Sequence, residues 1–265
     1  MVYYLGIDVG SISTKLAVLD AGAQLIASTC LHTGGEPLAA VRNGLKQIIS
    51  QKPDAVIAGI AVTGSARELV ARMVGAGLVK NEITTQAAAT RHYFPDVKTI
   101  IEIGGQDSKI IILRDGLVID FGMNTVCAAG TGSFLDHQAR RLGLSTGELG
   151  ELANRSRAPE PIAGRCTVFA ESDMIHRQQS GARTEDIVYG LCKTLVQNYL
   201  TSVAAGKDIQ PPLVMQGGLA LNHGMVRAFE EELGYQITIP EHPELMGAIG
   251  VALLVREEQI ISPKC

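Results

Sequence analysis

Aromatic residues are scarce in this chain of 265 residues, in which Trp is absent and Phe, Tyr and Trp together make up 4% of the sequence. Glycine, by contrast, occurs 29 times, so the chain is richer in tight backbone turns than in aromatic binding surfaces. A surplus of positive charge is also missing, because 23 Lys and Arg residues stand against 27 Asp and Glu residues and give a net charge of −4. No basic stripe is available to neutralise the phosphates of a duplex, and we expect no nucleic-acid partner.

Long hydrophobic runs are absent as well. The longest uncharged apolar stretch, residues 245–255, contains two glycines and is shorter than the about 20 apolar residues that a membrane-spanning helix needs. Asp8 stands where a secretory signal would have its apolar run, and no basic leader precedes it. We therefore expect a cytoplasmic protein with no membrane span. Its hydrophobic share of 46% is enough to fill the cores of one large or two medium α/β domains.

The five cysteines follow no Cys-x-x-Cys spacing, and their number is odd. In a reducing compartment such residues are expected to be thiols or metal ligands rather than disulfide partners. They are Cys30, Cys127, Cys166, Cys192 and Cys265. No ligand-type pattern surrounds Cys30, Cys192 or Cys265, and Cys192 is expected in the core.

Strands and helices alternate along the first part of the chain. Residues 3–9 and 15–19 are two apolar runs separated by a glycine turn, which predicts a hairpin. Apolar residues at helical spacing predict a helix over 38–49, and residues 55–62 predict a buried strand that leads into a helix over 67–74. This alternation predicts an α/β fold in which helices cover a sheet.

The chain also contains an internal repeat. With an offset of 94 residues, residues 8–15 fall on residues 102–109, and each copy reads as strand, acidic residue, glycine turn, hydroxyl, lysine and strand. The repeat predicts a duplicated domain, although glycine-turned hairpins resemble one another in any case. We expect a first domain over residues 1–95, completed by a C-terminal helix over 244–258, and a second domain over residues 96–243.

Both hairpin turns have the composition of a phosphate site. Backbone N–H groups of a glycine turn, with hydroxyls beside them, hold phosphate oxygens through several donors, and two such turns would hold a triphosphate from both sides. Asp8 and Asp107 provide the oxygen ligands that Mg²⁺ prefers, directly or through water. Neither turn has the Walker pattern, because no Gly-Lys-Ser/Thr sequence opens a helix after a strand.

A third turn, Gly217-Gly218, follows the strand expected over 213–215 and leads into a helix that carries Asn222. It suits close approach of a flat ring, or it is only a tight connection between strand and helix.

The order of the two hairpins and the Gly-Gly turn resembles the phosphate-1, phosphate-2 and adenosine motifs of the acetate and sugar kinase, heat-shock chaperone and actin (ASKHA) superfamily. The resemblance implies two ribonuclease-H-like domains with ATP and Mg²⁺ between them, and domain closure coupled to the γ-phosphate. Asp8 and Asp107 are then assigned to Mg²⁺ and the attacking water, and Lys15 to the β- and γ-phosphates. The turn over 130–133 is similar to turns that approach phosphate in some sugar kinases. The candidate nucleotide-binding residues are Gly10, Ser11, Ser13, Thr14, Lys15, Gly104, Gly105, Gln106, Gly130, Gly132, Gly217 and Gly218.

Two cysteines stand at or just before expected helix starts. A helical pattern follows Cys127 from Phe134 to Leu142, and another begins with Thr167 after Cys166. The N-terminus of a helix stabilises a thiolate and any anionic cluster that the thiolate holds. A cubane iron–sulfur cluster needs four thiolates, and two chains would supply them. The alternative is that each cysteine is a small buried hydrophobe.

The segments over 103–109, 127–136 and 166–175 resemble the activator (archerase) family, which serves 2-hydroxyacyl-CoA dehydratases and includes the ATPase subunits of benzoyl-CoA reductases. The resemblance runs from residue 5 to about residue 255. It implies that Cys127 and Cys166 of each subunit hold one [4Fe-4S] cluster at a homodimer interface. It also implies an ATP-hydrolysing one-electron donor to a second iron–sulfur enzyme, with ferredoxin or flavodoxin as the electron source in an anaerobic host.

The sequence departs from this family at two places. Gln86 stands where a histidine is usual, and Ser65 stands in a turn that usually has tyrosine, which points to a different client protein. Two other function classes remain open at this level. One is a sugar or acetate-type kinase without a cluster, and the other is a chaperone-like ATPase switch without redox chemistry.

Overall fold

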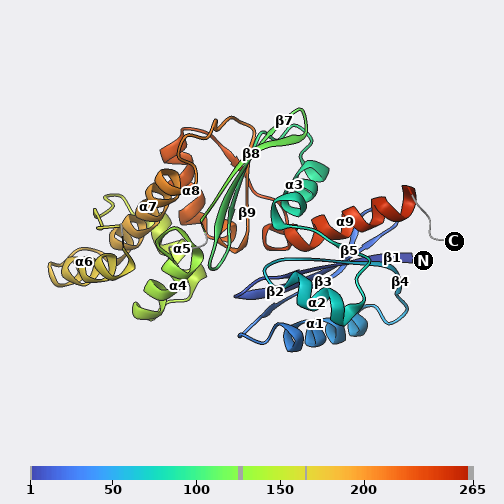
Figure 1. The fold of residues 1–265 in the computed structure, drawn as a ribbon. Coiled ribbons are helices and arrows are strands. Elements are labelled where there is room, and N and C mark those ends of the chain that lie inside the picture. The colour runs from blue at the N-terminus through green and yellow to red at the C-terminus, as the bar shows by residue number, and fades with distance from the viewer. Residues whose placement is uncertain (1, 125–127, 165, 262–265) are drawn as a thin grey trace. The chain divides into compact units, whose positions relative to one another are not determined.

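The structure is a computed structural model that describes residues 2–124, 128–164 and 166–261 (Figure 1). The chain divides into two compact units. The first unit consists of residues 1–95 and 245–265, and the second consists of residues 96–244. In the described part of the chain, no helix combines the length and the apolar character that crossing a membrane requires.

The first unit is built on a five-stranded sheet in the order β3-β2-β1-β4-β5. Its strands are β1 (Val2–Val9), β2 (Ser13–Asp20), β3 (Leu25–His32), β4 (Val56–Thr63) and β5 (Leu78–Val79). Its helices are α1 (Pro37–Gln51), α2 (Arg67–Val74), α3 (Glu82–Tyr93) and α9 (Met246–Ile261). Helices α1 and α2 cover one face of the sheet, while α3 and α9 lie on the other face (Figure 1). Because both faces are covered, β1 is buried along almost its whole length.

The second unit is built on a sheet in the order β10-β9-β6-β7-β8. Its strands are β6 (Thr99–Ile103), β7 (Ser108–Arg114), β8 (Leu117–Asn124), β9 (Leu213–Gln216) and β10 (Ile237–Thr238). Its helices are α4 (Gly132–Arg141), α5 (Thr146–Arg155), α6 (Thr167–Gln179), α7 (Thr184–Ser202) and α8 (His223–Leu233). Short 3-10 turns are η1 (Ala128–Gly130), η2 (Gly218–Leu221) and, at the boundary with the first unit, η3 (Pro243–Leu245).

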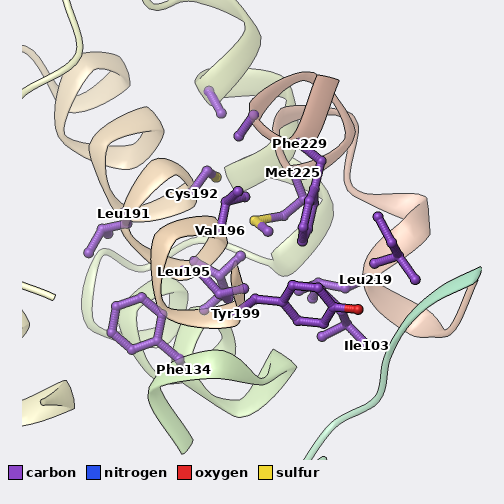
Figure 2. Packing of buried hydrophobic residues seen from close by; sticks show 14 of the residues in the cluster. Ile103, Phe134, Leu191, Cys192, Leu195, Val196, Tyr199, Leu219, Met225 and Phe229 are labelled. Carbon is purple, nitrogen blue, oxygen red and sulfur yellow. The ribbon is translucent and has the colours of Figure 1, made fainter. Parts of the chain in front are cut away.

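Helix α7 runs through the core of the second unit. It is buried on most of its surface, as expected for a helix that other elements surround. Figure 2 shows Cys192, Val196 and Tyr199 of α7 packed near Met225 and Phe229 of α8. The rings of Tyr199 and Phe229 meet edge to face with 5.2 Å between their centroids. The helix therefore provides a rigid element beside the sheet.

The two sheets have the same connectivity. In each, the first three strands form an antiparallel meander, and the first strand also pairs in parallel with the fourth, β1 with β4 and β6 with β9. The repeat predicted from the two hairpins therefore extends to whole sheets. The correspondence also includes the residue that directly follows the fourth strand of each sheet. This residue is Gly64 after β4 and Gly217 after β9, and both have positive φ, 96° and 88°.

One expected boundary was wrong. Asn222 does not lie within a helix after the Gly-Gly turn, because the turn first forms the short η2. Asn222 instead is the N-cap of α8, where its side-chain oxygen accepts a hydrogen bond from Met225 N at 3.1 Å. Asparagine is among the residues that most favour this position, and α8 itself begins at His223.

Candidate functional site

The turn between β1 and β2 is closed by its own backbone and by Thr33, which directly follows β3. Gly10 N donates to Ser13 O at 3.0 Å, and Thr33 N donates to Ile12 O at 2.8 Å. Thr33 Oγ1 donates to Gly10 O at 2.8 Å. Thr33 was not among the predicted site residues, because it lies outside the repeated segment. These bonds hold the turn in a fixed shape before any ligand arrives.

The hydroxyls of this hairpin have different surroundings. Ser11 is exposed and Ser13 is half-buried. Thr14 is fully buried, and its hydroxyl lies 3.0 Å from that of Thr33. Of the three predicted hydroxyl ligands, Ser11 and Ser13 are accessible to a ligand, whereas Thr14 is buried against Thr33.

Asp8 and Lys15 face each other across this hairpin. They are directly paired in the register of β1 and β2, and Lys15 Nζ lies 3.4 Å from Asp8 Oδ2. Asp8 also lies beside the start of α9, since a methyl group on Gly247 would come within 2.7 Å of Asp8 Oδ2 and 3.4 Å of Gln86 Nε2. The departure at Gln86 therefore lies next to the carboxylate that we assign to Mg²⁺.

The second hairpin repeats this pair in a more buried form. Lys109 faces Glu102 in the register of β6 and β7, and its side chain is only 2% exposed. Lys109 Nζ lies 2.9 Å from Glu102 Oε2 and 2.8 Å from Asp107 Oδ2. Glu102 was not among the predicted site residues, although the internal repeat aligns it with Asp8. The ammonium thus stands between two carboxylates, one of which is the predicted Mg²⁺ ligand Asp107.

Helix α4 begins on the turn of the second hairpin. Gly132 N donates to Gly104 O at 2.9 Å, and Ser133 N donates to Gly105 O at 2.8 Å. Ser133 Oγ also donates to Gly105 O. The structure therefore brings Gly104, Gly105 and Gly132, three of the predicted nucleotide ligands, into direct contact.

The predicted adenosine turn follows β9. Gly217 N donates to Pro243 O at 2.9 Å, and a Cβ at this position would lie 2.4 Å from Ile103 O. Gly218 has nothing within 4 Å of its missing Cβ. The first glycine is therefore required by the fold, and the second leaves open space beside the turn.

Replacing Gly217 and Gly218 one at a time tests whether only the first glycine is required by the fold. Gly217→Ala is expected to lower the free energy of unfolding by about 2–3 kcal/mol, because it adds positive-φ strain to a backbone clash. Gly218→Ala is the matched control and is expected to change that free energy by at most about 0.5 kcal/mol. Denaturant titration of both variants measures the difference. Equal destabilisation would contradict the assignment of Gly217 to the close contact.

Cys166 is the N-cap of α6. Its backbone is extended, its carbonyl accepts a hydrogen bond from Ala170 N at 3.0 Å, and its side chain is partly accessible. The prediction that this thiol stands at a helix start is confirmed. The other predicted cluster ligand, Cys127, lies outside the described residues.

One side chain of α7 contacts the chain near both cysteines. Asn198 Nδ2 donates to Ala129 O at 3.3 Å and to Gly164 O at 2.5 Å. Ala129 follows Cys127 by two residues, and Gly164 precedes Cys166 by two. The two cysteine segments, far apart in sequence, are therefore joined through a single carboxamide.

Cys192 and Cys30 have opposite environments. Cys192 is fully buried, as expected, and burial raises the pKa of its thiol to about 12. Cys30 is exposed. Cys265 lies outside the described residues.

This contrast predicts selective alkylation in the iron-free protein. Iodoacetamide at neutral pH should label Cys30 and leave Cys192 unmodified, because a buried thiol with a raised pKa has almost no thiolate. Peptide mass spectrometry before and after denaturation in guanidinium measures both sites. Labelling of Cys192 in the native protein at the rate of Cys30 would contradict its place in the core.

The fold and these residues can be compared with known proteins. Residues 5–255 match the BadF/BadG/BcrA/BcrD ATPase family. The 2-hydroxyisocaproyl-CoA dehydratase activator of Clostridioides difficile is 34% identical over an alignment of 273 residues, which covers 99% of this chain and 98% of the relative.

Two solved structures are also similar along the whole chain. The crystal structure of (R)-2-hydroxyglutaryl-CoA dehydratase component A of Acidaminococcus fermentans has a TM-score of 0.92 and 32% identity, and covers 98% of this chain and 100% of its own. The activator of the 2-hydroxyisocaproyl-CoA dehydratase from Clostridium difficile, with bound ADPNP, has a TM-score of 0.89 and 32% identity, and covers 99% of each chain. The expected family and the expected α/β fold of two duplicated units are confirmed. The chain belongs to the BadF/BadG/BcrA/BcrD ATPase family and has the actin-like ATPase fold of the ASKHA superfamily.

Proposed function

We propose that this protein is an ATP-dependent activator that donates one low-potential electron at a time to a partner iron–sulfur enzyme. The observation that carries the proposal is the position of Cys166, partly accessible at the N-cap of α6, in a chain of this ATPase family. A small-molecule kinase or a chaperone-like switch has no use for a thiol at such a position.

Each unit carries turns whose composition suits ATP. The exposed Ser11, the half-buried Ser13 and Lys15 contact the β- and γ-phosphates from the first hairpin. From the second unit, the turn of Gly104, Gly105 and Gln106 contacts the phosphates with support from Gly130 and Gly132, and Gly217-Gly218 contacts the adenosine. The space beside Gly218 supports this last role, since an aromatic ring needs a surface without side chains.

Asp8 in the first unit and Asp107 in the second are each proposed as a ligand of Mg²⁺, directly or through water, and as a group that orients the attacking water. Both carry carboxylate oxygens, which are the donors that Mg²⁺ prefers. Asp8 Oδ2 lies near Lys15 Nζ and Asp107 Oδ2 near Lys109 Nζ, and these ammonium groups favour coordination through water over direct coordination. Lys15, assigned to the β- and γ-phosphates, also neutralises part of the charge that develops when the γ-phosphate is cleaved.

The donor set suits a [4Fe-4S] cluster shared by two chains. A thiol at the N-cap of a 13-residue helix lies at the positive end of the helix dipole, which stabilises a thiolate ligand and an anionic cluster. Cys127 is proposed as the second ligand on its sequence pattern. Two such cysteines from each protomer of a homodimer supply the four thiolates required. When bound, the cluster supplies a one-electron carrier of low potential.

The partner is a dehydratase or a related reductase. The relatives described above are named as dehydratase activators, which supports a client of this kind for the present chain. Reduced ferredoxin or flavodoxin is the electron source. We place the protein and these partners in the cytoplasm, with no role for nucleic acid or a membrane.

Anaerobic purification tests the proposal directly. The reconstituted protein is expected to be a dimer with about four irons per two chains, a broad visible absorption and an ATPase activity. With reduced ferredoxin and ATP it should pass electrons to a dehydratase client, and omission of ATP should stop the transfer. A monomer that holds no iron after reconstitution and phosphorylates a sugar would overturn the proposal in favour of a kinase.

A further inference from the structure

Three segments that the proposed function uses are all attached to the last two turns of α7. Asn198 donates to Ala129 O and Gly164 O, as described above. The next residue, Tyr199, is fully buried and donates its hydroxyl to Lys109 O at 2.7 Å. Burial raises the pKa of Tyr199 well above its usual value, so the hydroxyl stays protonated and remains a donor. One helix therefore contacts both cysteine segments and the second phosphate hairpin.

The carboxamide of Asn198 suits two carbonyls better than any other side chain of its size. Its nitrogen carries two hydrogens, and each is directed to a different carbonyl. An aspartate of the same shape would present only acceptors to these oxygens, and a leucine would present nothing. Asn198 is half-buried, so each of its hydrogen bonds contributes more to stability than the same bond would at the surface.

Thr194, one helical turn before Asn198, reinforces only one of these contacts. Thr194 Oγ1 donates to Ile162 O at 3.0 Å in a buried position. A Cβ on Gly164 would lie 2.1 Å from Thr194 Cγ2, so the segment over 162–164 lies directly against the helix. Residues four apart share a helix face, and this face of α7 therefore carries both supports of the segment before Cys166.

The segment after Cys127 has a second attachment to the phosphate hairpin. Ala129 belongs to η1, which leads directly into α4, and the first residues of α4 are bonded to Gly104 O and Gly105 O. A displacement of this turn by a bound phosphate is therefore transmitted to residues 129–133. Through Asn198, the same displacement reaches Gly164 and the start of α6.

We infer that Asn198 is a positioning residue that holds the two cysteine segments in one arrangement, and that it makes both segments respond together to nucleotide at the second hairpin. The inference rests on the proposed function, because it assumes that Cys127 and Cys166 act as a pair. The hydrogen bonds described for Asn198 go to backbone carbonyls. Its effect is exerted through backbone carbonyls two residues from each cysteine.

Hydrogen exchange of the iron-free protein tests the attachment without any cluster. In Asn198→Leu, amides of residues 128–132 and of residues 162–164 are both expected to exchange about tenfold faster, since each segment loses a hydrogen bond. In Thr194→Val, only the 162–164 segment is expected to exchange faster. Gln197→Leu, at the exposed neighbouring position, should change neither segment.

A second measurement tests the response to nucleotide. In the reconstituted protein, the midpoint potential is measured with ADP and with a non-hydrolysable ATP analogue, and the difference between the two states is the readout. Asn198→Leu and Asn198→Asp are expected to lose at least about half of this difference while iron content and ATP affinity stay within about twofold. Asn198→Asp serves as the second variant if the leucine form does not fold.

The outcomes separate the inference from the proposed function. Unchanged exchange in both segments, or faster exchange in only one of them for Asn198→Leu, overturns the inference. So does an unchanged nucleotide-dependent difference in potential in a fully loaded variant. A wild-type protein that binds no iron overturns the proposed function instead, while the exchange result for Asn198 still stands.

Discussion

Replacing Cys166 by serine is expected to abolish the cluster while leaving ATP binding within about twofold of the wild-type value. Iron content and visible absorption should fall to background after anaerobic reconstitution, because a serine hydroxyl is a poor ligand for iron at neutral pH. The substitution suits this position, since serine is a better N-cap than cysteine and α6 should begin as before. Iron analysis, spectroscopy and isothermal titration with an ATP analogue measure the three quantities.

Cys30→Ser is the matched control for this experiment. Cys30 is exposed in β3 of the first unit, and its replacement should leave iron content and absorption unchanged. A Cys166→Ser protein that keeps about four irons per two chains would remove Cys166 from the ligand set. The proposal would then be reduced to an ATPase in which Cys166 has no redox role.

Replacing Lys109 by methionine is expected to destabilise the protein by about 3–5 kcal/mol. Lys109 is buried, and its ammonium contacts the carboxylates of Glu102 and Asp107 at 2.9 and 2.8 Å. Methionine fills a similar volume but leaves the buried Glu102 without its positive partner, and an uncompensated buried charge is among the most costly changes in a core. Chemical denaturation at neutral pH measures the loss.

Two further variants show whether charge is the cause. Lys109→Met combined with Glu102→Gln should recover most of the lost stability, because the double variant buries neither charge. Lys15→Met is the control from the other half of the repeat, where the ammonium lies 3.4 Å from Asp8 and both side chains are more exposed. It should cost about 1 kcal/mol or less. A double variant as unstable as Lys109→Met alone would assign the effect to packing.

Local patterns predicted most of the fold. The two hairpins, the helix after Pro37 and the thiol at the start of α6 follow from glycine turns, apolar spacing and residue preferences, all of which act over a few neighbouring residues. The internal repeat also predicted two similar units, and the shared strand order bears this out. Such features are readable because the physics behind them is local.

The interior of the site was less accessible to sequence reasoning. The pattern identified Thr14 as a hydroxyl residue of the first turn but could not show that its side chain lies buried against Thr33. The internal repeat aligned Glu102 with Asp8, but no role in the site was assigned to Glu102. Its contact with Lys109 depends on the pairing of β6 with β7, which the sequence pattern does not show. Asn198 gave no signal, since its two carbonyl partners are 69 and 34 residues away. Contacts over such distances are decided by tertiary packing alone.

The two lysine–carboxylate pairs occupy matching positions of the internal repeat but differ in how tightly they are held. In the later half, a second acid at position 107 holds the ammonium tightly, whereas the earlier half has a serine at the matching position 13 and a looser pair. The pair in the second unit is therefore the more constrained one, since its ammonium contacts two carboxylates rather than one. Substitutions around Lys15 are accordingly expected to be tolerated more readily than substitutions around Lys109.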